Sequence, residues 1–299
     1  MMIKLKLPSD CENYFIIFNI YCNKVKRDIN LKNRLRNNRN DLIFRSLFIL
    51  YNKYARNNDL YLILNLLKYI GIEQGLIPII NKDVLYLYNT YFSKKGKRAR
   101  TFYDQIINLA KDPKKQCPFC GGLGEPSELD HFLPKSVFGY YAIFPYNLIP
   151  ICKECNQKYK KEFYPKTKNE QLIHSYLDND CFFYEQWLFA EIIINNNDVS
   201  ISTARFYVNP PNHWSEDSKG KVRFHFEKFK LDERFATRAG GDLGELIREV
   251  SHAKSNKIDP QDFISARLAI HRESYPMNHW KKALYQAFEQ QIRNIWNYA

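Results

Sequence analysis

Two closely spaced cysteine pairs, Cys117-Pro-Phe-Cys120 and Cys152-Lys-Glu-Cys155, constrain the fold of this chain more than any other feature. Four thiolates at such spacings can surround one zinc ion tetrahedrally, and a metal held in this way contributes directly to the folding of a small domain. A redox dithiol and unrelated buried cysteines are the alternatives, but a redox motif needs only one pair and leaves the second unexplained. We therefore expect Cys117, Cys120, Cys152 and Cys155 to form a structural zinc site.

Residues that bind cations and transfer protons lie between and directly after the two pairs. Asp130 and His131 end a short predicted strand, Asn147 follows a loop, and Asn156 comes directly after the last cysteine. A carboxylate is a hard ligand suited to Mg²⁺ or Mn²⁺. An imidazole titrates near neutral pH and can take a proton from water. Strand, loop, strand and helix would then enclose one cation. The alternative interpretation of His131 is a histidine with a purely structural role.

This arrangement resembles the HNH, or ββα-metal, endonucleases, and specifically their zinc-stapled members. The resemblance rests on residues between Cys117 and Asn156 and includes Pro134. It implies that His131 is the general base, that Asp130 and Asn156 bind the catalytic cation, and that Asn147 holds the loop and the base in place. The expected reaction is hydrolysis of phosphodiester bonds, with DNA as the substrate and Mg²⁺ or Mn²⁺ as the catalytic cofactor.

One departure from the family pattern concerns phosphate contact. The family commonly has a lysine three residues beyond the position of Asn156, where this chain has Tyr159. Lys158 and Lys160 flank that tyrosine. They are therefore the candidates to contact a phosphate.

Composition favours a cytoplasmic protein with a nucleic-acid partner. Seven cysteines are present, and Cys11, Cys22 and Cys181 lie outside the two pairs, which argues against a secreted disulfide scaffold. The net charge of +13 is concentrated in residues 1–100, where 19 Lys and Arg face 7 Asp and Glu. A polyanion partner explains this asymmetry, as does a solvated Lys/Asn-rich surface. The same two interpretations apply to the run Lys94–Arg100.

No apolar run reaches about 18 residues, and no signal-peptide pattern is present, so we expect no membrane span.

We predict an α+β fold that is mostly helical and has three parts. Residues 1–112 form a basic helical region, with helices over residues 41–54, 59–70, 83–92 and 101–110. Residues 113–168 form the zinc-stapled ββα module, whose helix runs from Asn156 to Phe163. Residues 169–299 form a short β-hairpin over residues 187–208, followed by helices that break at Gly240-Gly241 and at Asp259-Pro260.

Segments outside the motif resemble bacterial HNH proteins of phage-defence systems of the Septu or retron-linked type. These segments include Val208–Trp214 and Asn278-His279-Trp280. The resemblance implies an antiviral effector with a regulatory partner, either an ATPase or a retron reverse transcriptase complex. Two alternatives stay open. One is a non-catalytic zinc-knuckle module that binds nucleic acid, and the other is an effector subunit that is active only with its partner.

Overall fold

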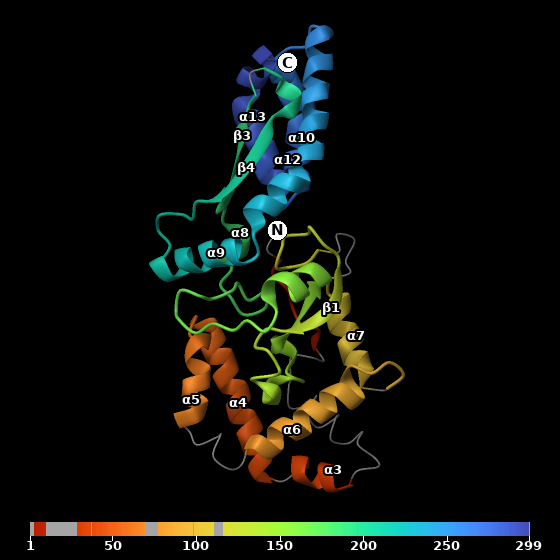
Figure 1. The fold of residues 1–299 in the computed structure, drawn as a ribbon, viewed down its shortest axis with the longest axis vertical. Coiled ribbons are helices and arrows are strands. Elements are labelled where there is room, and N and C mark those ends of the chain that lie inside the picture. The colour runs from red at the N-terminus through yellow and green to blue at the C-terminus, as the bar shows by residue number, and fades with distance from the viewer. Residues whose placement is uncertain are drawn as a thin grey trace. The chain divides into compact units, whose positions relative to one another are not determined.

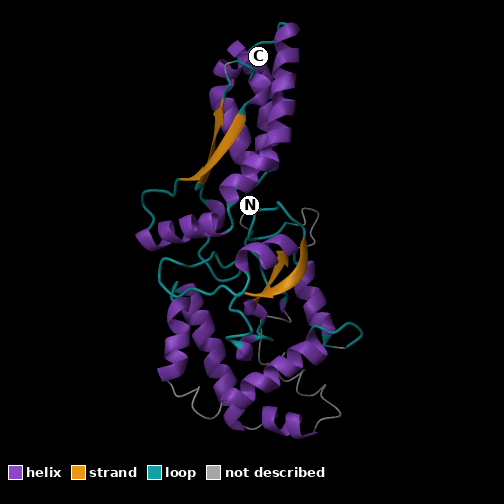
Figure 2. Ribbon diagram, viewed as in Figure 1, coloured by secondary structure: helices purple, strands orange, loops and turns teal. Residues whose placement is uncertain are grey.

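The computed structural model describes residues 3–9, 29–36, 38–69, 77–97, 99–110, 116–195 and 197–298. Helices dominate, and the described strands form two small antiparallel sheets (Figure 2), which confirms the expected α+β class. The chain forms two compact units. One comprises Lys4–Pro118 and Gly124–Asn179, and the other comprises Met1–Ile3, Phe119–Leu123 and Asp180–Ala299. The three-part division stays a prediction, and Cys11 and Cys22 lie outside the described residues.

The first unit begins with helices whose buried faces follow the helical period. On α4 (Asn38–Arg56) the buried residues Phe44, Leu47, Tyr51 and Ala55 recur every three or four positions, which places them on one face. The predicted helices over residues 41–54, 83–92 and 101–110 are confirmed in outline. The elements are α3 (Ile29–Arg36), α4 (Asn38–Arg56), η1 (Leu60–Leu62), α5 (Ile63–Tyr69), α6 (Ile77–Leu87), η2 (Tyr88–Phe92) and α7 (Arg100–Asn108).

A β-hairpin-like pair and a short helical turn follow in the same unit. Strand β1 (Pro126–His131) pairs antiparallel with β2 (Leu148–Cys152), so that His131 lies opposite Leu148. The connection contains η3 (Gly139–Tyr141) and η4 (Pro145–Asn147), and η5 (Cys155–Lys160) follows β2. The expected helix to Phe163 is wrong beyond Lys160, because Lys161 adopts a left-handed φ of 52° that ends the turn.

The second unit is a helical layer packed on a β-hairpin. Strands β3 (Leu188–Ile193) and β4 (Thr203–Val208) pair antiparallel. Helices α10 (Leu231–Ser255) and α13 (Trp280–Tyr298) run alongside them (Figure 1). Alternate residues of both strands are buried, which is the pattern of a sheet with one face on the core. The remaining elements are α8 (Cys181–Tyr184), η6 (Val199–Ile201), α9 (Glu216–Lys228), α11 (Pro260–Phe263), η7 (Ile264–Leu268) and α12 (Ala269–Ser274).

The predicted helix break at Gly240-Gly241 is wrong, because α10 continues through both glycines. Each glycine costs a helix about 1 kcal/mol relative to alanine. The buried residues Phe235, Ala239 and Leu243 lie on one face of α10 and offset that cost by packing. The predicted break at Asp259-Pro260 is confirmed, since Asp259 caps α11 by accepting a hydrogen bond from Gln261 N.

Asn278, from the Asn278-His279-Trp280 segment, has a structural role. Its Oδ1 accepts hydrogen bonds from Trp187 N at 2.8 Å and Leu188 N at 3.1 Å, while its Nδ2 donates to Glu185 O at 2.8 Å. Asn278 therefore fixes the start of β3 against the segment that precedes α13.

Within the part of the chain that the structure describes, no helix is both long and apolar enough to cross a membrane.

Candidate active site

The four paired cysteines form one buried cluster. The sulfur atoms of Cys117, Cys120, Cys152 and Cys155 all lie within 4.8 Å of one another. A tetrahedral zinc site with Zn–S bonds of about 2.3 Å needs sulfurs about 3.8 Å apart, so small side-chain adjustments suffice to hold a metal. Cys152 N donates to Cys117 Sγ and Cys155 N donates to Cys152 Sγ, both at 3.4 Å. The expected clustering is confirmed, and zinc as the occupant stays a prediction.

Glycines give the first knuckle the tight backbone that this cluster requires. Gly121 and Gly122 have φ values of 61° and 89°, which favour glycine over residues with a side chain. A Cβ added at Gly124 would lie 2.8 Å from Cys152 Sγ. The chain therefore approaches the second knuckle too closely at residue 124 for any larger residue to fit without a shift.

His131 is a buried, neutral imidazole at the end of β1. Its Nε2 lies 3.0 Å from Ala142 O, and because a carbonyl only accepts, Nε2 carries the proton and Nδ1 keeps its lone pair. Burial lowers the pKa of His131 to about 3, although the hydrogen bond to Ala142 raises it in part. The ring of Tyr88 packs edge-on against it, with ring centroids 4.6 Å apart. The imidazole is thus fixed in orientation and offers one proton acceptor.

Asn147 joins the two ends of the loop between β1 and β2. Its Oδ1 accepts from Leu133 N at 2.7 Å, and its Nδ2 donates to Leu133 O at 3.1 Å and to Tyr141 O at 3.3 Å. The side chain is fully buried. This is the loop-holding geometry that the sequence led us to expect, while a direct part for Asn147 in catalysis stays a prediction.

A buried chain of hydrogen bonds extends this clamp to α4. Tyr51 Oη donates to Asn147 Oδ1 at 3.0 Å and lies 3.2 Å from His174 Nε2. Since His174 Nδ1 accepts from Tyr176 N, the neutral ring carries its proton on Nε2 and donates to Tyr51. Sequence reasoning did not find Tyr51 or His174. The N-terminal helical region therefore buttresses the site, whatever its positive charge contacts.

Asp130 is engaged by a buried lysine. Lys160, which has no exposed surface, places Nζ 2.6 Å from Asp130 Oδ2 and donates to His131 O at 2.8 Å. The first contact is an ion pair. Burial raises the pKa of Asp130, and Lys160 lowers it in part. The expectation that Lys160 contacts a phosphate is wrong, because its ammonium lies inside the protein and holds the end of β1.

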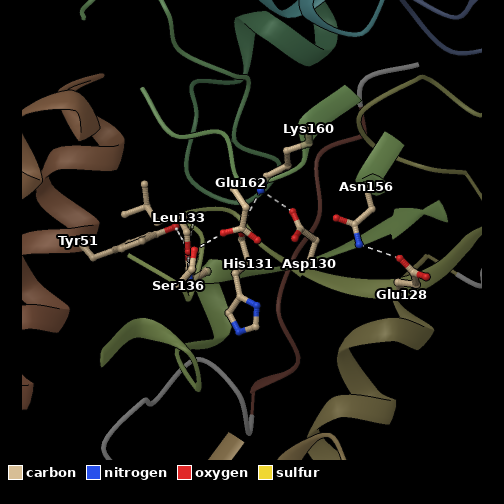
Figure 3. Close-up of polar contacts among 10 residues, drawn as sticks. Tyr51, Glu128, Asp130, His131, Leu133, Ser136, Asn156, Lys160 and Glu162 are labelled. Atoms are coloured by element: carbon tan, nitrogen blue, oxygen red, sulfur yellow. Dashed lines mark hydrogen bonds and ion pairs between the residues drawn. The ribbon is translucent and has the colours of Figure 1, made fainter. Parts of the chain in front are cut away.

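Asn156 is oriented by an acidic neighbour. Its Nδ2 donates to Glu128 Oε2 at 2.7 Å, and a carboxylate can only accept, which fixes the two ends of the amide. In Figure 3 the Asn156 side chain lies between Glu128 and Asp130, with its oxygen on the side of Asp130. The His131 ring and the Asp130 carboxylate leave β1 in different directions in the same view. Asn156 thus presents a carbonyl oxygen toward the carboxylate, as a shared cation would require.

These groups line one pocket of about 430 Å³, to which Asp130, His131 and Asn156 all contribute. Tyr88, Lys135, Lys161 and Glu162 also line it; Ser136 Oγ donates to Glu162 (Figure 3). The structure therefore brings together the predicted base and both predicted cation ligands. Among the described residues, the cysteine cluster is the only group of three or more His, Cys, Asp or Glu that is tight enough to hold a metal.

The basic run Lys94–Arg100 divides into two kinds of residue. Lys94, Lys95 and Lys97 are exposed, and Arg98 lies outside the described residues. Arg100 instead packs over the Tyr103 ring and pairs with Asp104 at 2.8 Å. Arg100 thus has a structural role, and phosphate tracking by the exposed lysines stays a prediction.

Comparison with known proteins identifies one curated relative. Protein ea31 of Escherichia phage lambda is 32% identical over 212 residues, which cover 67% of this chain and 69% of that protein. The chain belongs to the ea31 family. No protein-family model matches the ea31-like chain, and no solved structure is significantly similar to it.

The relationship to ea31 does not indicate an activity. The chemistry that the site can perform is therefore argued from its geometry. Sequence reasoning did not single out four residues of the pocket, namely Tyr88, Lys135, Lys161 and Glu162. Tyr88 comes from η2, 43 positions before His131, while Lys135 and Glu162 sit near the motif without a distinctive spacing. The run Pro134-Lys135-Ser136 was the one local signal, because it begins three residues after His131.

Proposed function

We propose that this member of the ea31 family is a metal-dependent endonuclease of the HNH class that hydrolyses phosphodiester bonds in DNA. One observation carries the proposal: the His131 imidazole, the Asp130 carboxylate and the Asn156 amide line a single pocket. Each is fixed by a contact that leaves its reactive atom available. These contacts are His131 to Ala142 O, Asp130 to Lys160, and Asn156 to Glu128.

The residues fit a hydrated Mg²⁺ or Mn²⁺ held by two protein oxygens. Carboxylate and amide oxygens are hard ligands, and Mg²⁺ usually keeps several waters beside one or two protein ligands. Such a cation would stabilise the negative charge that develops on the phosphate and on the leaving 3′ oxygen. His131 Nδ1 would accept the proton of the attacking water. A phosphate in the pocket favours that transfer, because a nearby anion raises the pKa of an imidazole.

Cleavage of supercoiled plasmid DNA by the purified, zinc-loaded protein tests the proposal. We expect nicked or linear product with Mg²⁺ or Mn²⁺ and none with EDTA. His131→Ala should lower the rate by about 10²–10⁴-fold, the usual contribution of a general base. His213→Ala is the matched control, because this histidine side chain is 72% exposed and does not line the pocket. Cleavage by His131→Ala at the wild-type rate would refute the assignment.

The same assay separates the alternatives. DNA binding without cleavage under any divalent cation would favour the non-catalytic zinc-knuckle module. Cleavage that begins only when an ATPase or a retron reverse transcriptase complex is added would favour the partner-dependent effector. The proposed setting in antiviral defence requires that the His131→Ala allele abolish any protection of cells against phage, measured as plaque numbers.

A further inference from the structure

Two lysines of the pocket are left unused by the chemistry described so far. Lys135 and Lys161 both line the pocket that contains Asp130, His131 and Asn156. We propose that Lys135, assisted by Lys161, forms the subsite that binds the scissile phosphate of the nucleic acid. This inference rests on the proposed function and names the substrate contact of the same site.

The two lysines that the sequence favoured for this contact are unsuited to it. Lys160 is fully buried, and its ammonium is already engaged with Asp130 Oδ2 and His131 O. Lys158 is 66% exposed, does not line the pocket, and lies 3.9 Å from Glu154 Oε1. A phosphate inside the pocket would therefore meet neither ammonium group.

Lys135 is held at the pocket wall with most of its donors unused. It follows Pro134 in a turn closed by Phe138 N, which donates to Pro134 O at 2.8 Å. Its Nζ lies 4.6 Å from the centre of the Tyr88 ring and 3.5 Å from Asn89 Oδ1. An ammonium has three donors, and within the described residues no carboxylate forms an ion pair with Lys135. Its remaining hydrogens are available to a ligand.

The same tyrosine places Lys135 beside the proposed base. The ring of Tyr88 contacts His131 edge-on at 4.6 Å between centroids, and it lies under the Lys135 ammonium at 4.6 Å. An anion bound by Lys135 would thus sit in the part of the pocket next to the imidazole. This is where an attacked phosphorus must lie if His131 is to activate the water.

Lys161 adds a second positive charge at a strained backbone position. It adopts φ 52° and ψ −136°, which a residue with a side chain rarely does, and such strain is often found at functional sites. Of the charged groups in the pocket wall, Asp130 is paired with Lys160 and Glu162 accepts from Ser136 Oγ. Lys135 and Lys161 balance the charges of Asp130 and Glu162, and the buried Lys160 beside Asp130 leaves these five groups with a net charge of +1, which suits a phosphate.

Equilibrium binding of a fluorescent duplex DNA to the zinc-loaded protein, with no Mg²⁺ or Mn²⁺ added, tests the subsite without cleavage. We expect Lys135→Gln to weaken binding about tenfold, as loss of one charge-assisted contact implies. The logarithm of the association constant decreases with the logarithm of the salt concentration, and this slope should become less steep by about 0.9, the value for one lost phosphate contact to duplex DNA. Lys135→Arg should keep most of the affinity. Lys158→Gln, on the adjacent turn but outside the pocket, should match the wild type.

The outcomes separate this inference from the proposed function. If wild type cleaves DNA with Mg²⁺ but Lys135→Gln binds with wild-type affinity and salt slope, the subsite is overturned and the nuclease stands. If Lys158→Gln loses as much affinity as Lys135→Gln, the binding reflects general surface charge and the subsite is again overturned. If the wild type cleaves DNA with Mg²⁺ but shows no binding without the cation, the subsite is overturned and the nuclease stands; if it neither binds nor cleaves DNA with Mg²⁺ or Mn²⁺, the proposed function fails.

Discussion

Replacing Lys160 by methionine is a sharp test of the buried ion pair that holds Asp130. Methionine has a similar length but no charge, so the largely buried carboxylate of Asp130 would lose its charged partner. Breaking a buried pair in this way costs about 3–5 kcal/mol. Loss of the bond from Lys160 Nζ to His131 O, at 2.8 Å, leaves a second group without its donor. Since the two effects share one side chain and are not additive, we expect a total loss of about 4 kcal/mol.

Urea unfolding of the zinc-loaded protein measures this loss as a shift of the midpoint at constant slope. Asp130→Asn in the Lys160→Met background should recover most of the stability, because the unpaired charge is then removed. Lys158→Met is the matched control, since its exposed pair with Glu154 should contribute less than about 1 kcal/mol. Mn²⁺ should stabilise Lys160→Met more than the wild type if the cation replaces the missing ammonium beside Asp130.

The reasoning would be refuted by a Lys160→Met protein that loses less than about 1 kcal/mol, because removing the fully buried ammonium from its pair with Asp130 should cost more. A double variant no more stable than Lys160→Met alone would also contradict it. That result would mean that the loss arises from packing of the lysine stem and not from the charge left on Asp130.

Two further perturbations test the supports of the site. Tyr51→Phe removes the hydroxyl between Asn147 Oδ1 and His174 Nε2 and should lower the free energy of unfolding by about 1–3 kcal/mol in the same urea assay. The control is Tyr86→Phe, which changes a half-exposed side chain and should alter the free energy of unfolding by less than about 0.5 kcal/mol. Equal losses of stability in the two variants would disprove the buried chain of hydrogen bonds. Gly124→Ala should weaken zinc binding in a competition with a coloured chelator, because its Cβ would approach Cys152 Sγ to 2.8 Å. Gly240→Ala is the control and should leave zinc binding unchanged, because a Cβ at that position meets nothing within 4 Å. An unchanged zinc affinity in Gly124→Ala would argue against Cys152 as a ligand.

Local patterns predicted the parts of this protein that local physics determines. The cysteine spacing led to the buried sulfur cluster, and helical periodicity led to α4 and α7, because both depend on residues close in sequence. Asn147 was found because its position matches the middle asparagine of the HNH pattern. Its actual partners include Tyr51, 96 positions away, which no local pattern reveals.

The burial of Lys160 could not be predicted for a related reason. Lysine is almost never fully buried unless it is paired, and nothing in Lys158-Tyr-Lys160-Lys161 distinguishes one lysine from its neighbours. The distinction arises in the fold, where Lys161 N bonds to Asn156 O at 2.8 Å and closes a π-type turn with one extra residue. That turn directs Lys160 inward and leaves Lys158 exposed.

The glycines of α10 show the opposite failure, in which a local signal was strong but misleading. A Gly-Gly pair often marks a break, yet α10 spans Leu231–Ser255 without interruption. Packing of its buried face against β4 and α13 outweighs the local preference. Sequence reasoning underestimates such long-range burial wherever a helix is held by its neighbours.

The position of manganese in crystals of the zinc-loaded protein soaked with Mn²⁺ tests the central claim most directly, because anomalous scattering distinguishes manganese from the protein. The account predicts a single manganese within bonding distance of the Asp130 carboxylate and the Asn156 amide oxygen, beside His131 Nδ1. Manganese bound elsewhere, with Asp130 still held by Lys160 and no ion between it and Asn156, would contradict the account.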